Sequence, residues 1–135
     1  MTSEVIYLGD LRTKATHLQS GDSIITDAPI DNQGKGEAFS PTDLCATSLA
    51  SCILTIMGIK ARDHQIDMSG TRATVLKTMV ADPDRRIGRI DIDIYLPEKN
   101  WTVEDRSILT QAAASCPVCR SLSPALEIRK QLIWP

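Results

Sequence analysis

Four cysteines are the residues of this 135-residue chain whose type and spacing could do chemistry. Cys45 and Cys52 are seven positions apart, so on a helix they share one face. Cys116 and Cys119 bracket a Pro-Val pair. From the sequence alone two interpretations stay open: Cys52 and Cys116 form a redox pair, or the thiols bind a metal.

The metal interpretation is the weaker of the two. Zinc normally takes four ligands, usually from two pairs of closely spaced cysteines. A seven-residue spacing inside a helix is poor zinc geometry, so no metal is expected. The Cys-Pro-Val-Cys motif is redox-active when it opens a helix after a strand, whereas here it follows a predicted helix. Thiol–disulfide exchange through this motif stays a further alternative, beside the inert packing that is common for buried cysteines.

Residues 40–64 are predicted to form one long helix that carries Cys52. Ser40 can cap this helix, Pro41 suits its first position, and Asp43 stands three residues after the cap. An almost uncharged run follows from 44 to 59, and a helix that is apolar on all sides should be buried all round. The run is shorter than a usual membrane span and contains serines and threonines, so a core helix is expected.

Length and charge narrow the class of protein. A chain of 135 residues predicts a single domain over 1–135. The chain has fifteen basic and seventeen acidic residues and no basic run, so it lacks the positively charged surface that is typical of a nucleic-acid-binding protein. The start of the chain lacks the pattern of a signal peptide. A cytoplasmic protein with no membrane partner is therefore expected, and cysteines there are more often thiols than structural disulfides.

Strands and further helices are expected around the long helix. The clearest strand is 87–96, where isoleucines at 90, 92 and 94 alternate with aspartates. Pro117 should end or kink the helix before it. The other strands are expected at 5–11, 12–18, 23–26, 71–80 and 127–134, a loop at 28–38, and helices at 102–115 and 117–122.

These elements predict an α+β fold in which helices pack on one mainly antiparallel sheet of about six strands. A single sheet covers only one side of a helix that is apolar all round. A second copy of the chain could cover the rest, so an obligate homodimer with the long helices at its centre is expected.

Three stretches resemble the osmotically inducible protein C / organic hydroperoxide resistance (OsmC/Ohr) superfamily, and its OsmC-like branch in particular. They are SPTDLCATSLASC at 40–52, IDIDIYLP at 90–97 and AAASCPVCRSLSP at 112–124. The GDLR sequence at 9–12 and SGT at 69–71 also fit. The resemblance covers essentially the whole chain. It implies an intertwined α+β homodimer whose sheet wraps around long central helices, and it implies a thiol peroxidase that reduces organic hydroperoxides, and hydrogen peroxide less well, in oxidative-stress defence.

The resemblance also implies roles for two cysteines. Cys52 matches the peroxidatic cysteine and Cys116 the resolving one. The Cys52 thiolate would attack the peroxide and become a sulfenic acid, and Cys116 would condense with it to form a disulfide. A dithiol, for which a lipoyl-bearing protein can serve in the family, would then reduce the disulfide. No cofactor is implied.

Only a thiolate attacks peroxide, and Cys52 lies too far into its helix for the dipole to stabilise one. A nearby cation is therefore expected, and arginine stays charged when desolvated. The family uses an arginine held by a glutamate, which directly follows the helix-start proline. This chain has Thr42 there, so Asp43 is the nearest carboxylate and Arg12 the best arginine. A capping role for Asp43 and a solvated strand position for Arg12 are the alternatives.

The substrate pocket is expected to be apolar and lined by Phe39, Leu49, Ile53 and Ile56. Cys45 is expected to fill core space. Cys119 is expected to be a partly exposed thiol, with competition against Cys116 as the resolving thiol as the alternative. A non-catalytic, ligand-binding protein of the same fold is the second functional hypothesis, and Thr42 favours it somewhat.

Overall fold

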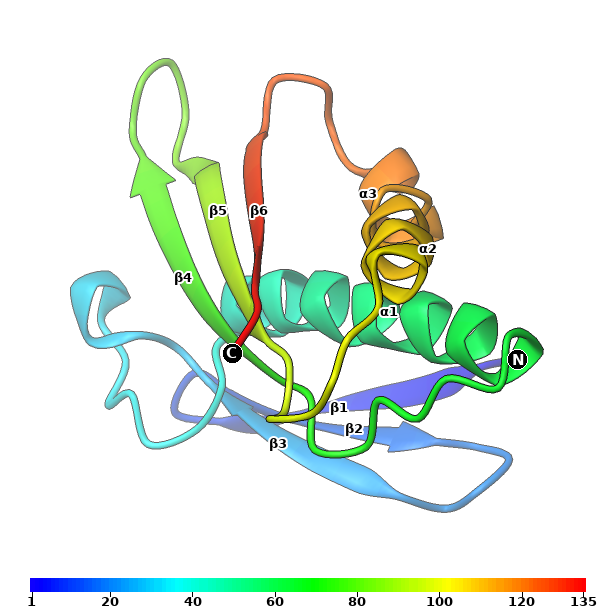
Figure 1. Ribbon diagram of the computed structural model, residues 1–135. Coiled ribbons are helices and arrows are strands. Elements are labelled where there is room, and N and C mark those ends of the chain that lie inside the picture. The colour runs from blue at the N-terminus through cyan, green and yellow to red at the C-terminus, as the bar shows by residue number, and fades with distance from the viewer. The chain divides into compact units, whose positions relative to one another are not determined.

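Three antiparallel strands open the chain in the computed structural model, which describes residues 1–135 (Figure 1). They are β1 (Ser3–Gly9), β2 (Arg12–His17) and β3 (Ser23–Asp27), paired in that order. The short 3-10 helix η1 (Ile30–Asn32) lies in the predicted loop. The first strand was predicted to reach Leu11, but Gly9, Asp10 and Leu11 all have positive φ, so the chain turns there and β1 ends sooner.

The chain divides into two units, Met1–Cys45 and Ala46–Pro135. The first holds β1, β2, β3 and η1, and the second holds every later strand and the two helices that follow residue 100. The helix α1 (Pro41–Asp63) runs through the boundary between them. The single domain predicted from the chain length stays a prediction.

The second unit contains another three-stranded sheet, with β4 (Arg72–Val80), β5 (Arg86–Tyr95) and β6 (Glu127–Ile133) in that order. The strands β4 and β5, both predicted from the sequence, form an antiparallel hairpin, whereas β6 pairs in parallel with β5. The expectation of one sheet of about six strands is therefore wrong. A parallel pair needs a crossover connection, which α2 (Val103–Ala113) and α3 (Pro117–Ser121) supply here.

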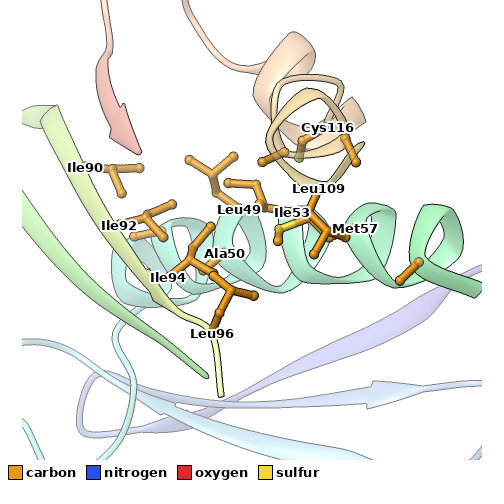
Figure 2. Close-up of a cluster of buried hydrophobic side chains, with 14 of the residues drawn as sticks. Leu49, Ala50, Ile53, Met57, Ile90, Ile92, Ile94, Leu96, Leu109 and Cys116 are labelled. Carbon is orange, nitrogen blue, oxygen red and sulfur yellow. The ribbon is translucent and has the colours of Figure 1, made fainter. Parts of the chain in front are cut away.

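The hydrophobic core of the second unit lies between α1, β5 and α2 (Figure 2). The isoleucines at 90, 92 and 94 have no exposed surface, which confirms the predicted alternation of β5. The intervening Asp91 and Asp93 form ion pairs with arginines of the same sheet. One face of α1 completes this core, with the buried residues Ala46, Leu49, Ala50, Ile53, Met57 and Ala61.

The helix α1 is long and apolar enough to cross a membrane by length and composition alone. Its buried residues recur every three or four positions, however, and pack in the core, as expected for a core helix. Within one chain the burial is confined to this face, because Ser48, Ser51 and Thr55 are exposed. Burial on every side, as the sequence predicted, would need a further covering surface.

Candidate active site

Cys52 and Cys116 meet in the second unit although they come from different helices. Cys52 is half-buried in α1, and Cys116 precedes α3 with no exposed surface. Burial raises the pKa of the Cys116 thiol, and a hydrogen bond with the Cys52 thiol and the charge of Cys52 raise it further. Both cysteines are thiols rather than a disulfide. The two sulfurs are thus close enough to interact directly.

Pro117 explains how the chain places Cys116. The helix α2 ends at Ala113, and Pro117 occupies the start of the next helix, where its missing N–H costs nothing. Cys116 is left as the extended capping residue of α3, and its Sγ accepts a hydrogen bond from the Cys119 N–H at 3.5 Å. The predicted break at Pro117 is therefore confirmed. The Cys-Pro-Val-Cys motif follows one helix, as predicted, and also opens another.

Arg12 lies in a cluster of carboxylates within the first unit. Its Nη2 is 2.6 Å from Glu37 Oε2 and 3.6 Å from Asp27 Oδ2. The Arg12 side chain is two-thirds buried and ion-paired, so it is only partly the solvated strand residue of the alternative interpretation. Arg12 is thus held by two carboxylates, and neither of them is Asp43, the carboxylate that the sequence suggested. The role of Arg12 toward Cys52 stays a prediction.

Asp27 has no exposed surface. The Glu37 N–H donates to its Oδ2 at 3.0 Å, and this bond is the main cause that holds the Asp27 pKa below its usual value, with the Arg12 charge and hydrogen bond adding to it. Its Oδ1 and the Nε of Arg12 are buried without hydrogen-bond partners. Sequence reasoning missed Asp27 and Glu37. The hairpin register, which pairs Arg12 with Asp27, was the signal that could have found Asp27.

Asp43 occupies a helix cap. Its Oδ2 accepts a hydrogen bond from the Ser40 N–H at 2.9 Å, and the Asp43 N–H donates to Ser40 Oγ at 3.1 Å. This reciprocal pair is a capping box. The capping alternative therefore has a direct structural basis, and the catalytic role of Asp43 stays a prediction.

A model of the family described as OsmC-like protein matches residues 34–130. The chain belongs to the OsmC-like family. None of the curated proteins matches it. A crystal structure of a proposed osmotic stress induced and detoxification response protein from Psychrobacter arcticus is 55% identical, with a TM-score of 0.89 over 100% of this chain and 96% of that one.

More distant structures share the fold of this OsmC-like protein. The organic hydroperoxide resistance protein OsmC of Legionella pneumophila is 16% identical, with a TM-score of 0.75 over 98% of this chain and 96% of that one. An organic hydroperoxide resistance protein of Elizabethkingia anophelis is 13% identical, with a TM-score of 0.75 over 100% and 97% of the two chains. At these identities the likeness establishes the α+β fold and no more.

The predicted pocket residues of this OsmC-like protein are not gathered around a described cavity. Leu49 and Ile53 have no exposed surface and pack in the core, Ile56 is half-buried, and Phe39 is exposed and belongs to the first unit. Their role in binding substrate stays a prediction. A cavity of about 320 Å³ in the second unit is lined by other residues: Lys60, His64, Ile108, Gln111, Ala112 and Ser115.

Proposed function

We propose that this OsmC-like protein is a thiol-dependent peroxidase that reduces organic hydroperoxides, and hydrogen peroxide less well, in oxidative-stress defence. The observation that carries the proposal is the direct interaction of the Cys52 and Cys116 thiols. The names of the more distant relatives, which include organic hydroperoxide resistance proteins, agree with this substrate class. The chemistry needs only thiols and no cofactor.

Cys52 performs the first step of the proposed reaction. Its thiolate attacks the distal peroxide oxygen, the O–O bond breaks, and the alkoxide takes up a proton and leaves as an alcohol. Cys52 is then a sulfenic acid. Half-buried Cys52 suits this role, because peroxide must reach its sulfur while the surrounding protein limits access by larger molecules.

Cys116 performs the second step. Its sulfur attacks the Cys52 sulfenic sulfur, the S–O bond breaks, and water leaves as the disulfide forms. Because the two thiols already interact, little rearrangement is needed. A dithiol, such as a lipoyl-bearing protein, then reduces the disulfide through a mixed disulfide and returns both thiols. The cytoplasm keeps such dithiols reduced, so we place the reaction there.

Arg12 is our candidate for the cation that stabilises the Cys52 thiolate. Asp27 and Glu37 hold its guanidinium, which is the role that the family gives to a glutamate. Two carboxylates fix the position of the side chain while leaving it positively charged, because arginine does not deprotonate in proteins. Arg12 and Cys52 belong to different units, so kinetics of Arg12 variants is the test of this role.

We also propose that the protein is a homodimer. Apolar side chains of the first unit are exposed on β1 and β3, including Val5, Tyr7 and Ile24 at 61%, 65% and 49% exposure. Exposed apolar surface on this scale is typical of an interface. Light scattering coupled to size-exclusion chromatography should give twice the chain mass of 14.8 kDa. A single-chain mass at micromolar concentration would contradict the proposal.

The alternative is a non-catalytic, ligand-binding OsmC-like protein. Thr42 favours it, because this position carries the activating glutamate in the family that the sequence resembles. The capping box of Asp43 favours it too, since that carboxylate is engaged in stabilising α1. Such a protein would keep Cys52 unreactive toward peroxide.

One experiment separates the two functions. Reduced protein is treated with one equivalent of cumene hydroperoxide, quenched with acid, alkylated and digested for mass spectrometry, beside Cys52→Ser. A Cys52–Cys116 disulfide that forms within the first turnover, and is absent from the variant, is the expected result. A treated protein in which every thiol stays reduced would rule out the peroxidase.

A further inference from the structure

A third thiol lies next to the Cys52–Cys116 pair, and the proposed reaction does not use it. The Cys119 N–H donates to Cys116 Sγ at 3.5 Å, so the backbone of Cys119 is in contact with the sulfur of Cys116. The Cys119 side chain is half-buried and packs against the same core cluster that contains Cys116. Three cysteines of the second unit thus form one continuous cluster centred on Cys116.

The spacing of Cys116 and Cys119 allows a disulfide between them. Cys116 is the extended residue that precedes α3, and Cys119 lies three positions later in the first turn of that helix. Side chains at this separation on a helix are neighbours, with Cβ atoms about 5–6 Å apart. A disulfide needs a Cβ separation of about 3.5–4.5 Å. Rotation about the backbone of the capping residue can close this small difference.

The second disulfide would change which sulfur an external reductant can reach. Cys116 has no exposed surface, so a protein dithiol cannot reach its sulfur from outside. Cys52 lies in the middle of the long helix α1. Cys119 is half-buried, as Cys52 is, and lies between the exposed residues Pro117 and Arg120 on a helix of five residues. A Cys116–Cys119 disulfide therefore offers a reductant a half-buried sulfur on a short helix whose neighbouring residues are exposed.

We propose that Cys119 is a third catalytic cysteine, which receives the disulfide from Cys52. The proposal rests on the peroxidase function above. The Cys119 thiol loses a proton to solvent, and its thiolate attacks Cys116 Sγ of the Cys52–Cys116 disulfide. The Cys116–Cys119 bond forms, the Cys52–Cys116 bond breaks, and Cys52 leaves as a thiolate. The exchange is internal, so no oxidant or reductant is consumed.

The exchange has two consequences for the reaction cycle. Cys52 regains its thiolate before any reductant arrives, so it is ready for a second peroxide. The external dithiol then reduces a Cys-X-X-Cys disulfide by attack on Cys119, and the mixed disulfide that it forms is resolved by its own second thiol. In this cycle peroxide oxidises Cys52, and the external dithiol reduces the Cys-Pro-Val-Cys motif.

Tryptic mapping distinguishes the two disulfides by mass. Cleavage after Lys35, Lys60, Arg106 and Arg120 places Cys45 and Cys52 on one peptide, and Cys116 and Cys119 together on another. A Cys52–Cys116 disulfide crosslinks the two peptides. A Cys116–Cys119 disulfide leaves the second peptide alone, two hydrogens lighter than its reduced form. Acid quenching at increasing times after one equivalent of cumene hydroperoxide follows the conversion.

The wild type is expected to show the crosslink first and then its loss, as the internal disulfide appears and Cys52 becomes open to alkylation. In Cys119→Ser the crosslink should form at the wild-type rate and persist. Cys45→Ser is the matched control, because it removes the fourth thiol and should leave both steps unchanged. It also assigns the crosslink to Cys52.

A crosslink that persists in the wild type, with no internal disulfide, would overturn the proposal and leave the peroxidase function intact. A peroxide-treated protein whose thiols all stay reduced would overturn both. Since the wild-type time course needs no substitution, a Cys119→Ser variant that fails to fold does not affect the test.

Discussion

The carboxylate of Asp27 lies 3.6 Å from the guanidinium of Arg12, and the two residues face each other across β2 and β3. Asp27 is the charged residue with no exposed surface, and it accepts a hydrogen bond from the Glu37 backbone as well. A buried carboxylate must be paired to stay charged. The ion pair therefore holds the Arg12 side chain in place within the first unit. It also makes the stability of this unit sensitive to acid.

Asp27 should contribute to stability in a pH-dependent way. The Glu37 N–H, and then Arg12, hold its pKa in the folded protein below the ordinary value of 3.8. A lowered pKa stabilises the fold above the unfolded-state value, and this contribution is lost as the pH falls through the lower, folded-state value. Thermal melts of the wild type from neutral pH downward should show this loss. Asp27→Asn should melt lower at neutral pH but lose less on acidification, and an unchanged acid dependence would contradict the role of Asp27.

Arg12→Gln should slow the oxidation of Cys52 at neutral pH if Arg12 supplies the activating charge. A neighbouring opposite charge shifts an ionisation equilibrium by about tenfold or more, so the second-order rate constant with cumene hydroperoxide should fall by a similar factor. Arg62→Gln, which removes an exposed arginine from the end of α1, is the control. Stopped-flow fluorescence or thiol titration measures the rate. Equal rates in the wild type and Arg12→Gln would remove Arg12 from the mechanism.

The sequence was sufficient to predict where the helices and strands lie along the chain, because the residue patterns that specify them are local. The alternation of isoleucine and aspartate predicted β5, and Ser40, Pro41 and Asp43 predicted the start of α1. The pairing of β6 with β5 was missed because a parallel neighbour is set by the crossover and not by the strand itself. The two-sheet arrangement was missed for the same reason.

The candidate site was predicted only in part. The family resemblance selected Cys52 and Cys116, and the structure brings their thiols together. The carboxylates around Arg12 come from positions 27 and 37, which are joined to it by hairpin register and by a loop. The contact with Glu37 through the loop leaves no spacing pattern in one sequence. The nearby Asp43 was an attractive candidate only because it is close to Thr42 along the chain.

Asp43→Ala tests whether that carboxylate caps the helix or activates Cys52. Asp43 supplies one hydrogen bond of the capping box, and loss of such a bond costs about 0.5–1.5 kcal/mol, so denaturant unfolding should show a decrease of this size in the free energy of unfolding. The rate of Cys52 oxidation, measured where the variant is fully folded, should stay at the wild-type value. Asp43→Asn is the matched control, because the asparagine Oδ1 can still accept the hydrogen bond from the Ser40 N–H. A rate that falls in both variants, with stability retained in Asp43→Asn, would instead give Asp43 the catalytic role.

The step that closes the Cys52–Cys116 disulfide should accelerate as the pH rises. Burial is the main cause that raises the pKa of Cys116 above its ordinary value of 9.0, and it persists when Cys52 becomes an uncharged sulfenic acid. Because the thiolate is the attacking form, the closing rate should increase about tenfold per pH unit below that pKa. Sulfenic acid at Cys52 should therefore survive longest at low pH, where trapping with dimedone is most efficient. Cys116→Ser should give full trapping at every pH. A closing rate that is flat with pH in the wild type would show that Cys116 does not close the disulfide as a free thiolate.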